Sequence, residues 1–135
     1  MRENLGLLLA KRAALSPRLE GLVEVELGRR FTFEALNARA NRTANALLGL
    51  GVCRGDRVGL LLPNSPQFVI SYYGLLKAGV AVVPLNPMST ERELSFFLTD
   101  SQAETAITIP MFLGKVCSLI GTTPLRRVVC SPLSD

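Results

Sequence analysis

The second half of this sequence alternates short apolar segments with segments of helical length, and this alternation restricts the fold more than any other feature. The apolar segments predict strands at residues 58–62, 80–84, 105–109 and 127–130. The segments between them predict helices at residues 67–77, 91–99 and 111–120. Strands that are apolar on both faces and separated by helices form right-handed crossovers within a parallel sheet. The sequence therefore predicts an α/β fold with a doubly wound, mostly parallel sheet that helices cover on both faces.

The first part of the chain has a different pattern, which predicts a helix followed by a hairpin. The helix covers residues 4–15, and its apolar positions are Leu5, Leu8, Leu9 and Leu15. The hairpin has an alternating strand at residues 22–27, a turn at residues 28–30 and a return at residues 31–32. Both of its sides are expected at the periphery of the molecule.

A long helix is predicted from residue 33 to about residue 50. Thr32 can cap its N-terminus, and Gly51 can adopt the left-handed conformation beyond its C-terminus. Its apolar face comprises Leu36, Ala40, Ala44, Leu47 and Leu48. We therefore expect one incomplete N-terminal subdomain over residues 1–135, with the N-terminal helix, hairpin and long helix at 1–57 and βαβ units at 58–135.

The composition is that of a globular domain without a nucleic-acid partner. The 135 residues leave room for one core, and 48% of them are apolar against 19% charged. The formal net charge is +4, but the basic residues are dispersed among acidic ones, and no aromatic side chains interleave with them. Nucleic acid is therefore not an expected partner.

The histidine and cysteine content limits the catalytic and metal sites that the chain can hold and indicates its cellular compartment. The chain has no histidine, which excludes a Ser-His-Asp triad and histidine ligation of a metal within it. Cys53, Cys117 and Cys130 lie far apart and form no Cys-x-x-Cys pair, which argues against a disulfide framework and a zinc site. Lys11 and Arg12 interrupt the first apolar stretch, so no export signal is visible. We expect a cytoplasmic location.

An uncharged stretch between Arg57 and Lys77 has the hydropathy of a membrane span. However, the sequence Pro-Asn-Ser-Pro at residues 63–66 divides it into a strand-length piece and a helix-length piece. We interpret both pieces as buried core and expect no transmembrane segment.

Open parallel sheets bind ligands beyond the carboxyl ends of their strands, so the turns after Leu62, Pro84 and Ile109 are the candidate site. None of these turns carries a nucleotide-binding signature. The glycines at 49 and 51 end a helix, with Arg54 where a third glycine belongs. The glycines at 74 and 79 have phosphate-loop spacing, but a valine follows them in place of lysine.

Two polar turns leave a choice between helix capping and ligand contact. Asn64 or Ser65 can cap the helix that Pro66 opens, and the turn at residues 86–89 precedes a helix for which Thr90 and the glutamate three residues later have capping-box spacing. Capping is the favoured interpretation of both turns, with ligand contact as the alternative.

The remaining candidates favour structural roles. Arg39 and Arg42 on the long helix could meet a phosphate, but we interpret them as solvated helix surface. Tyr72 and Tyr73 could line a pocket, but adjacent helix positions favour one core and one boundary residue. The Arg-Gly-Asp-Arg turn at residues 54–57 is typical of local backbone geometry.

The linear order of several short motifs is informative. They are FTFEAL at 31–36, GVCRGDRV at 51–58, LPNSP at 62–66, LKAGV at 76–80, PLNP at 84–87, REL at 92–94 and DSQA at 100–103. This ordered set closely resembles the opening of the adenylate-forming acyl-CoA synthetases, the family that also holds luciferases and nonribosomal peptide adenylation domains. It covers nearly all of residues 31–109, and its PLNP turn and REL helix are most similar to fatty-acid–CoA ligases.

The resemblance implies a two-step reaction. ATP and a carboxylate give an acyl-adenylate and pyrophosphate with the assistance of Mg²⁺, and the thiol of coenzyme A then displaces AMP. Such an enzyme must clamp phosphates and neutralise developing charge. In the family, these tasks belong to a Ser/Thr/Gly-rich loop ending in Pro-Lys-Gly, a Tyr-Gly-x-Thr-Glu segment, a ribose-binding aspartate and a lysine on a mobile C-terminal domain. All of them lie downstream of the part that matches here.

No catalytic, cofactor-binding or metal-binding residue is therefore assigned to this chain. The nearest imitation of the phosphate loop lies at residues 121–125, where Leu125 replaces the lysine. Met88 lies where some relatives place a basic residue that can meet a phosphate of coenzyme A. The resemblance implies ATP, Mg²⁺, coenzyme A and a small-molecule carboxylate for the full-length enzyme only. We expect an N-terminal fragment that binds no cofactor and is inactive alone.

Two alternatives stand beside this interpretation. A self-standing α/β binding or assembly module would use its uncovered sheet edge to pair with another chain. An unrelated flavodoxin-like nucleotide binder is disfavoured because its loop signatures fail. A split parallel sheet that exposes apolar strands is also expected to self-associate into a homo-oligomer.

Overall fold

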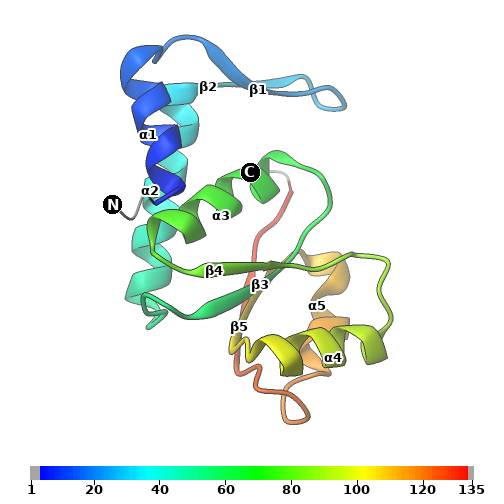
Figure 1. Cartoon of the computed structure of the whole chain (residues 1–135). Helices are drawn as coiled ribbons and strands as arrows, with labels where there is room; N and C mark the ends of the chain where they lie inside the picture. Colours follow the sequence, from blue (N-terminus) through cyan, green and yellow to red (C-terminus); the bar gives the residue numbers. More distant parts are fainter. Residues whose placement is uncertain (1–3, 134–135) are drawn as a thin grey trace.

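The computed structural model describes residues 4–133, and a long helix joins an N-terminal part to a parallel sheet (Figure 1). The N-terminal part contains α1 (Gly6–Leu15), β1 (Glu20–Glu24), β2 (Arg29–Thr32) and the long helix α2 (Phe33–Gly49). The sheet part contains β3 (Arg57–Leu61), α3 (Pro66–Lys77), β4 (Ala81–Pro84), α4 (Glu91–Ser101), β5 (Thr105–Thr108), α5 (Pro110–Cys117) and β6 (Arg127–Cys130). Every helix and strand that the sequence predicts is present.

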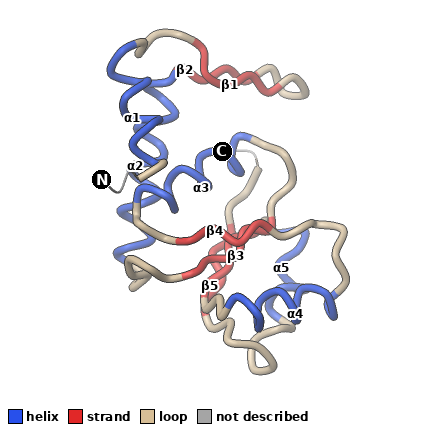
Figure 2. The backbone as a smooth tube through the Cα atoms, in the orientation of Figure 1, coloured by secondary structure: helices blue, strands red, loops and turns tan. Residues whose placement is uncertain are grey.

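The four strands of the larger sheet are parallel and lie in the order β4-β3-β5-β6. α3 connects β3 to β4, whereas α4 carries the chain back past β3 to β5. As Figures 1 and 2 show, α3 lies on one side of this sheet, and α4 and α5 lie on the other. The predicted doubly wound α/β fold is confirmed.

Two apolar clusters fill the two faces of the sheet. Val58, Leu60 and Ile107 contribute to a cluster with side chains of α2 and α3. Leu61 and Ala106 point the other way, into a cluster with side chains of α4 and α5. Burial on both faces explains why the strands are continuously apolar in the sequence.

A third cluster holds the N-terminal part together, with Leu9, Phe31, Leu36 and Ala40 as its buried members. The hairpin strands β1 and β2 are antiparallel, and Figure 2 shows the hairpin reaching out over the body that contains the sheet. α2 belongs to two clusters because its N-terminal half packs under the hairpin and its C-terminal half packs on the sheet.

Helix capping follows the sequence signals. The Thr32 side chain accepts a hydrogen bond from the backbone N–H of Ala35 at 3.1 Å. The side chain of Thr90 accepts from the N–H of Glu93, and the Glu93 carboxylate accepts from the N–H of Thr90, both at 3.2 Å. The predicted capping box is therefore confirmed, and Gly51 has the expected left-handed φ of 98°.

The buried face of α1 differs from the prediction. Leu5, Leu8 and Leu15 are 56%, 51% and 78% exposed, and the buried residues are Gly6, Leu9 and Ala13. The reason is a close approach of α1 to the end of α3, where a Cβ on Gly6 would lie 2.7 Å from the backbone nitrogen of Lys77. Close backbone contact selects small residues for this interface and leaves Leu5, Leu8 and Leu15 facing solvent.

Leu48 of α2 also differs from the prediction. It was expected on the apolar face of the long helix, but it is 46% exposed.

The hairpin is displaced toward the N-terminus relative to the prediction. β1 ends at Glu24, and residues 25–28 form the turn, so Val25 and Leu27 are exposed turn residues and not strand residues. Arg29 and Arg30 belong to β2 and not to the turn. The alternating pattern continues into the turn, which is why periodicity alone placed the strand too late.

None of the helices within residues 4–133 has both the length and the apolar character needed to cross a membrane. The uncharged stretch between Arg57 and Lys77 forms β3, a connecting loop and α3. The β3 side chains are buried in the two clusters of the sheet, as interpreted from the sequence, whereas α3 is only partly buried and also packs on the N-terminal cluster.

The contact between α2 and α3 is a close helix crossing at Gly74. A Cβ on Gly74 would lie 2.8 Å from the Cβ of Thr43 and 3.1 Å from the carbonyl oxygen of Ala40. Only glycine allows the two backbones to approach this closely. The same helix pair is further linked by Lys77, whose Nζ donates to Oδ1 of Asn37 at 2.6 Å, and burial lowers the pKa of this amine.

We expect Gly74→Ala to lower the free energy of unfolding by about 1–3 kcal/mol, because the added methyl group overpacks a rigid contact. The matched control is Gly114→Ala in α5, where an added Cβ meets no atom within 4 Å. That variant should raise the free energy of unfolding by about 0.5–1 kcal/mol, the ordinary benefit of alanine in a helix. Urea denaturation of both variants measures the difference, and equal effects would contradict this account of the crossing.

Candidate functional site

The strand order reverses between β3 and β5, which places the topological switch point of the sheet there. The two strands are tied at their carboxyl ends by Thr108, which is fully buried and donates through Oγ1 to the carbonyl of Leu61 at 2.9 Å. The segment after β6 joins the same edge, since the N–H of Ser131 donates to the carbonyl of Thr108 at 2.8 Å. This carboxyl edge is the position at which open parallel sheets bind ligands.

A cavity of about 430 Å³ lies at this edge, between the hairpin and the loop that follows β3. We call it the hairpin cavity. Its lining residues are Leu22, Val23, Glu24, Val25, Glu26, Asn64, Ser65, Pro66, Phe68 and Val69. A mostly apolar lining with a few polar groups is typical of small-molecule sites.

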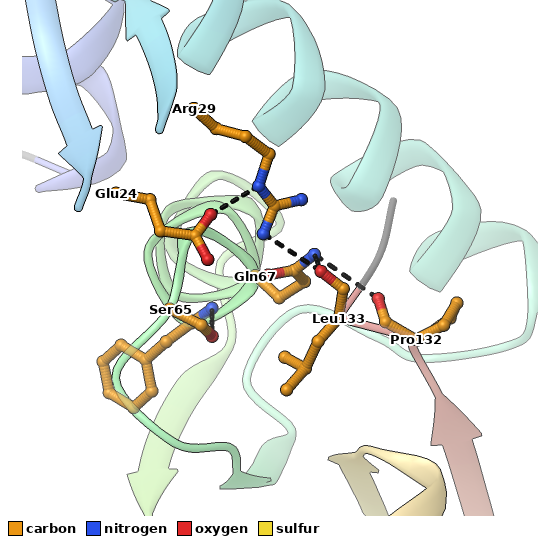
Figure 3. Close-up of polar contacts among 7 residues, drawn as sticks. Glu24, Arg29, Ser65, Gln67, Pro132 and Leu133 are labelled. Atoms are coloured by element: carbon orange, nitrogen blue, oxygen red, sulfur yellow. Dashed lines mark hydrogen bonds and ion pairs between the residues drawn. The ribbon is translucent and has the colours of Figure 1, made fainter. Parts of the chain in front are cut away.

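The hairpin is fixed in place by a small polar network, drawn in Figure 3. Arg29 of β2 forms an ion pair with Glu24 of β1 and donates through Nη2 to the carbonyl of Leu133 at 3.0 Å. Gln67, at the start of α3, donates through Nε2 to the same carbonyl at 3.0 Å and to that of Pro132 at 3.4 Å. The Arg29 and Glu24 side chains are only 23% and 17% exposed, so solvent screens this pair less than an open surface pair. The network joins the hairpin, α3 and the segment after β6.

Of the two candidates in the loop after β3, the structure assigns capping to Ser65. Its side chain accepts from the N–H of Phe68 at 3.3 Å and donates to the carbonyl of Pro63 at 3.0 Å. Asn64 is exposed and lines the hairpin cavity. The favoured capping role is therefore confirmed for Ser65, while Asn64 faces the space where a ligand would lie.

The turn at residues 86–89 is also held by local hydrogen bonds. Oδ1 of Asn86 accepts from the N–H of Met88 at 2.9 Å, and the carbonyl of Asn86 accepts from the N–H of Ser89 at 2.9 Å. Met88 is 87% exposed. This turn leads into α4, as its capping interpretation predicts.

The two tyrosines differ from the prediction of one core and one boundary residue. Both are half-buried, with Tyr72 packed on the sheet cluster and Tyr73 packed on the N-terminal cluster. α3 lies between these two clusters, so adjacent positions on it face different ones. Each tyrosine therefore packs on a different cluster and remains partly exposed.

The turn at residues 54–57 and the loop at residues 121–125 have structural roles. Oδ2 of Asp56 accepts from the N–H of Cys53 at 2.8 Å, which closes the turn before β3. Leu125 is 2% exposed and belongs to the cluster beneath α4 and α5. The loop is anchored by this apolar side chain at the position where a phosphate loop would carry its lysine.

No motif in the sequence indicates the contribution of the hairpin to this cavity. It was expected at the periphery, yet it forms one wall of the cavity and carries Arg29. Pairing of Glu24 with Arg29 across the turn is the only local sign that these side chains face the same way. Arg39 and Arg42 lie on the exposed surface of α2, as interpreted from the sequence, beside a second cavity, and the Arg39 guanidinium lies over the ring of Phe31 in β2.

The carboxyl edge carries few groups that could take part in chemistry. Among residues 4–133, no group of three or more His, Cys, Asp or Glu side chains is placed to hold a metal ion. The Ser65 hydroxyl donates to the carbonyl of Pro63, which is not a base that could activate the hydroxyl as a nucleophile. Fold and site together define an α/β scaffold with a doubly wound parallel sheet and a cavity at its carboxyl edge.

Comparison with known proteins identifies this scaffold more closely. The model of the AMP-binding enzyme family matches residues 9–132. The chain belongs to the AMP-binding enzyme family.

Curated relatives include the long-chain-fatty-acid–CoA ligase FadD13 of Mycobacterium tuberculosis, which is 44% identical over 105 residues. That match covers 78% of this chain and 21% of the relative. The long-chain-fatty-acid–CoA ligase of Bacillus subtilis is 37% identical over 108 residues, covering 80% of this chain and 19% of the relative. The chain thus spans about a fifth of the length of these relatives.

Solved structures agree with the family assignment. The N-terminal domain of FACL13 from M. tuberculosis superposes with a TM-score of 0.89 at 34% identity, covering 96% of this chain and 34% of that one. The anthranilate CoA ligase AuaEII, in complex with anthranoyl-AMP, superposes with a TM-score of 0.88 at 30% identity, covering 96% and 25%. The resemblance inferred from the ordered motifs is confirmed.

The polar network predicts that Arg29→Gln loosens the hairpin. Loss of hydrogen bonds from a charged donor costs about 1.5–3 kcal/mol, so backbone amides of residues 20–32 should exchange hydrogen about tenfold faster or more. Hydrogen-exchange mass spectrometry measures this change.

The matched control is Arg30→Gln on the same strand. The Arg30 and Glu20 side chains are 62% and 49% exposed, and exposed pairs of this kind contribute about 0–1 kcal/mol. This variant should leave hairpin exchange nearly unchanged. If both variants loosen the hairpin equally, the network around Leu133 is not what fixes it.

Proposed function

We propose that this chain supplies the N-terminal scaffold of an ATP-dependent ligase that joins a fatty acid to coenzyme A through an acyl-adenylate. The observation that carries the proposal is the similarity to two long-chain-fatty-acid–CoA ligases along most of the chain. The structural similarity to the N-terminal domain of FACL13 and to a ligase with a bound acyl-adenylate supports the same assignment.

In the proposed reaction, a carboxylate oxygen of the fatty acid bonds to the α-phosphorus of ATP and pyrophosphate leaves. The sulfur of coenzyme A then bonds to the acyl carbon, and AMP leaves. These steps require hydrogen-bond donors and cations that bind the phosphates and stabilise the charge that develops in the transition state. The residues at the carboxyl edge do not fit an Mg²⁺ site, and the loop at residues 121–125 carries a buried leucine in place of a lysine. No step of the reaction is therefore assigned to a residue of this chain.

The role proposed for the chain is to position loops around the switch point of its sheet. β3 and β5 hold the loops after residues 61 and 108 in a fixed register, and the hairpin closes over one of them. A rigid scaffold of this kind lowers the entropy cost of holding reactants in register. The exposed free thiols of Cys53, Cys117 and Cys130 support a reducing, cytoplasmic location.

A chimeric enzyme tests this proposal. Residues 9–132 replace the matching segment of FadD13, and fatty-acid-dependent exchange of pyrophosphate into ATP is measured. We expect the chimera to retain exchange within about tenfold of the parent, since a scaffold without catalytic groups can be substituted at a cost of about 1.4 kcal/mol or less.

A chimera carrying Gly74→Ala serves as the control, because it weakens the scaffold without touching the carboxyl edge. It should lose thermal stability before it loses exchange activity. The 135-residue chain alone should give no exchange. A folded chimera without activity, or an isolated chain with activity, would contradict the proposed role.

A self-standing assembly module is the second candidate, favoured by the edge strand β6. Within residues 4–133, β6 pairs only with β5, and an apolar cavity of about 250 Å³ lies beside it, lined in part by Leu47, Ile107 and Val129. An open edge of this kind can pair with another chain. Analytical ultracentrifugation distinguishes the two candidates. If the chain is an assembly module, it should form a stable oligomer. If it is the scaffold of a ligase, it should associate only weakly and in a concentration-dependent manner.

A further inference from the structure

A second cavity, of about 250 Å³, lies between α2, α3 and the segment that follows β6. We call it the arginine groove and define it by Arg39, Arg42, Thr43, Gln67, Ser71 and Ser131. It is separate from the hairpin cavity, because Gln67 and Ser71 lie on one side of α3, whereas Phe68 and Val69 line the hairpin cavity from another.

The groove exists because of how the two helices cross. Their backbones are closest at Gly74, where Thr43 and Ala40 contact α3. Ser71 and Gln67 lie three and seven residues before Gly74, one and two turns away from the crossing, where the helices leave room between them. The two helices thus form most of the groove, and the segment after β6 contributes Ser131.

Two uncompensated positive charges line the groove. Arg39 and Arg42 are three residues apart on α2 and therefore neighbours on its surface. The guanidinium of Arg39 is held over the ring of Phe31, with its carbon 5.3 Å from the ring centroid. No carboxylate lines the groove, and neither arginine forms an ion pair in the part of the chain that the structure describes.

Ser71 adds a hydroxyl group to the groove. Only 7% of this residue is exposed, it lines the groove, and its hydroxyl donates to no group among residues 4–133. The Oγ atom itself is open to the groove, so it is available to donate to a group that enters there. A ligand that fits the groove would accept a hydrogen bond from this hydroxyl and attract two guanidinium groups.

We propose that the arginine groove binds a phosphate group. A phosphate carries up to two negative charges and several acceptor oxygens, which match the forked donors of two arginines and the hydroxyl of Ser71. A single carboxylate would leave one of the two cations unpaired. The inference does not rest on the proposed ligase function, because it uses only the charges and the burial of the groove.

Calorimetric titration of the whole chain with inorganic phosphate tests the proposal, at a constant ionic strength because salt screens such attraction. We expect saturable binding with one site per chain. Arg42→Gln should weaken it about tenfold or more, and Ser71→Ala about fivefold, since each removes a hydrogen bond to a charged group. Arg92→Gln on α4 removes the same charge outside the groove and should change the affinity less than about twofold.

Nuclear magnetic resonance provides a second readout that does not depend on the variants. Phosphate should shift the backbone amide signals of Ser71, Thr43 and Ser131 with one common binding curve. Titration with methyl phosphate distinguishes the source of the group: tighter binding than inorganic phosphate indicates a phosphate ester, and equal binding indicates the free anion, both in support of the site. Absence of saturable binding, or equal weakening by Arg92→Gln and Arg42→Gln, would overturn the proposal.

Discussion

Burial of β3 on both of its faces is the constraint on which the rest of the structure depends. Val58, Leu60 and Leu61 are all 0% exposed, and burying side chains of this kind contributes about 1.5–3 kcal/mol each. Because successive residues of a strand point to opposite faces, both faces need a covering layer. α2 and α3 supply one layer, and α4 and α5 supply the other. The placement of each helix follows from this demand, as does the switch point beside β3.

The elements of the sheet could be predicted because each carries its own local signal. Thr90 and Glu93 form the capping box that their spacing implies, and Gly51 has the left-handed conformation that ends a helix. The exposed leucines of α1 could not be predicted, because the interface is decided by the backbone contact between Gly6 and Lys77. The residues around Gly6 in the sequence do not indicate where α3 lies in the fold. Periodicity reports which face is apolar, but close packing decides which face is used.

The candidate site shows the same division between local and distant information. Local hydrogen bonds make Ser65 the N-cap of α3, as the Pro-Asn-Ser-Pro pattern suggests. The walls of the hairpin cavity, in contrast, come from segments about 40 residues apart, so no motif contains them. The arginine groove likewise combines α2, α3 and a serine beyond β6. Family membership was recognisable because it rests on ordered local motifs, whereas these sites depend on tertiary contacts.

The hydrogen bond from Arg29 to the carbonyl of Leu133 spans 104 positions of the chain, and this separation has a consequence during synthesis. A ribosome adds about 5–20 residues per second, so Arg29 is synthesised roughly 5–20 s before its anchoring carbonyl. Until α3 is complete at residue 77, the hairpin has only α1 and α2 to pack on, and Leu22 and Val23 lack the α3 wall that later faces them. The nascent hairpin thus exposes Leu22 and Val23 until α3 covers them, and its anchoring hydrogen bond can form only after the last strand has been made.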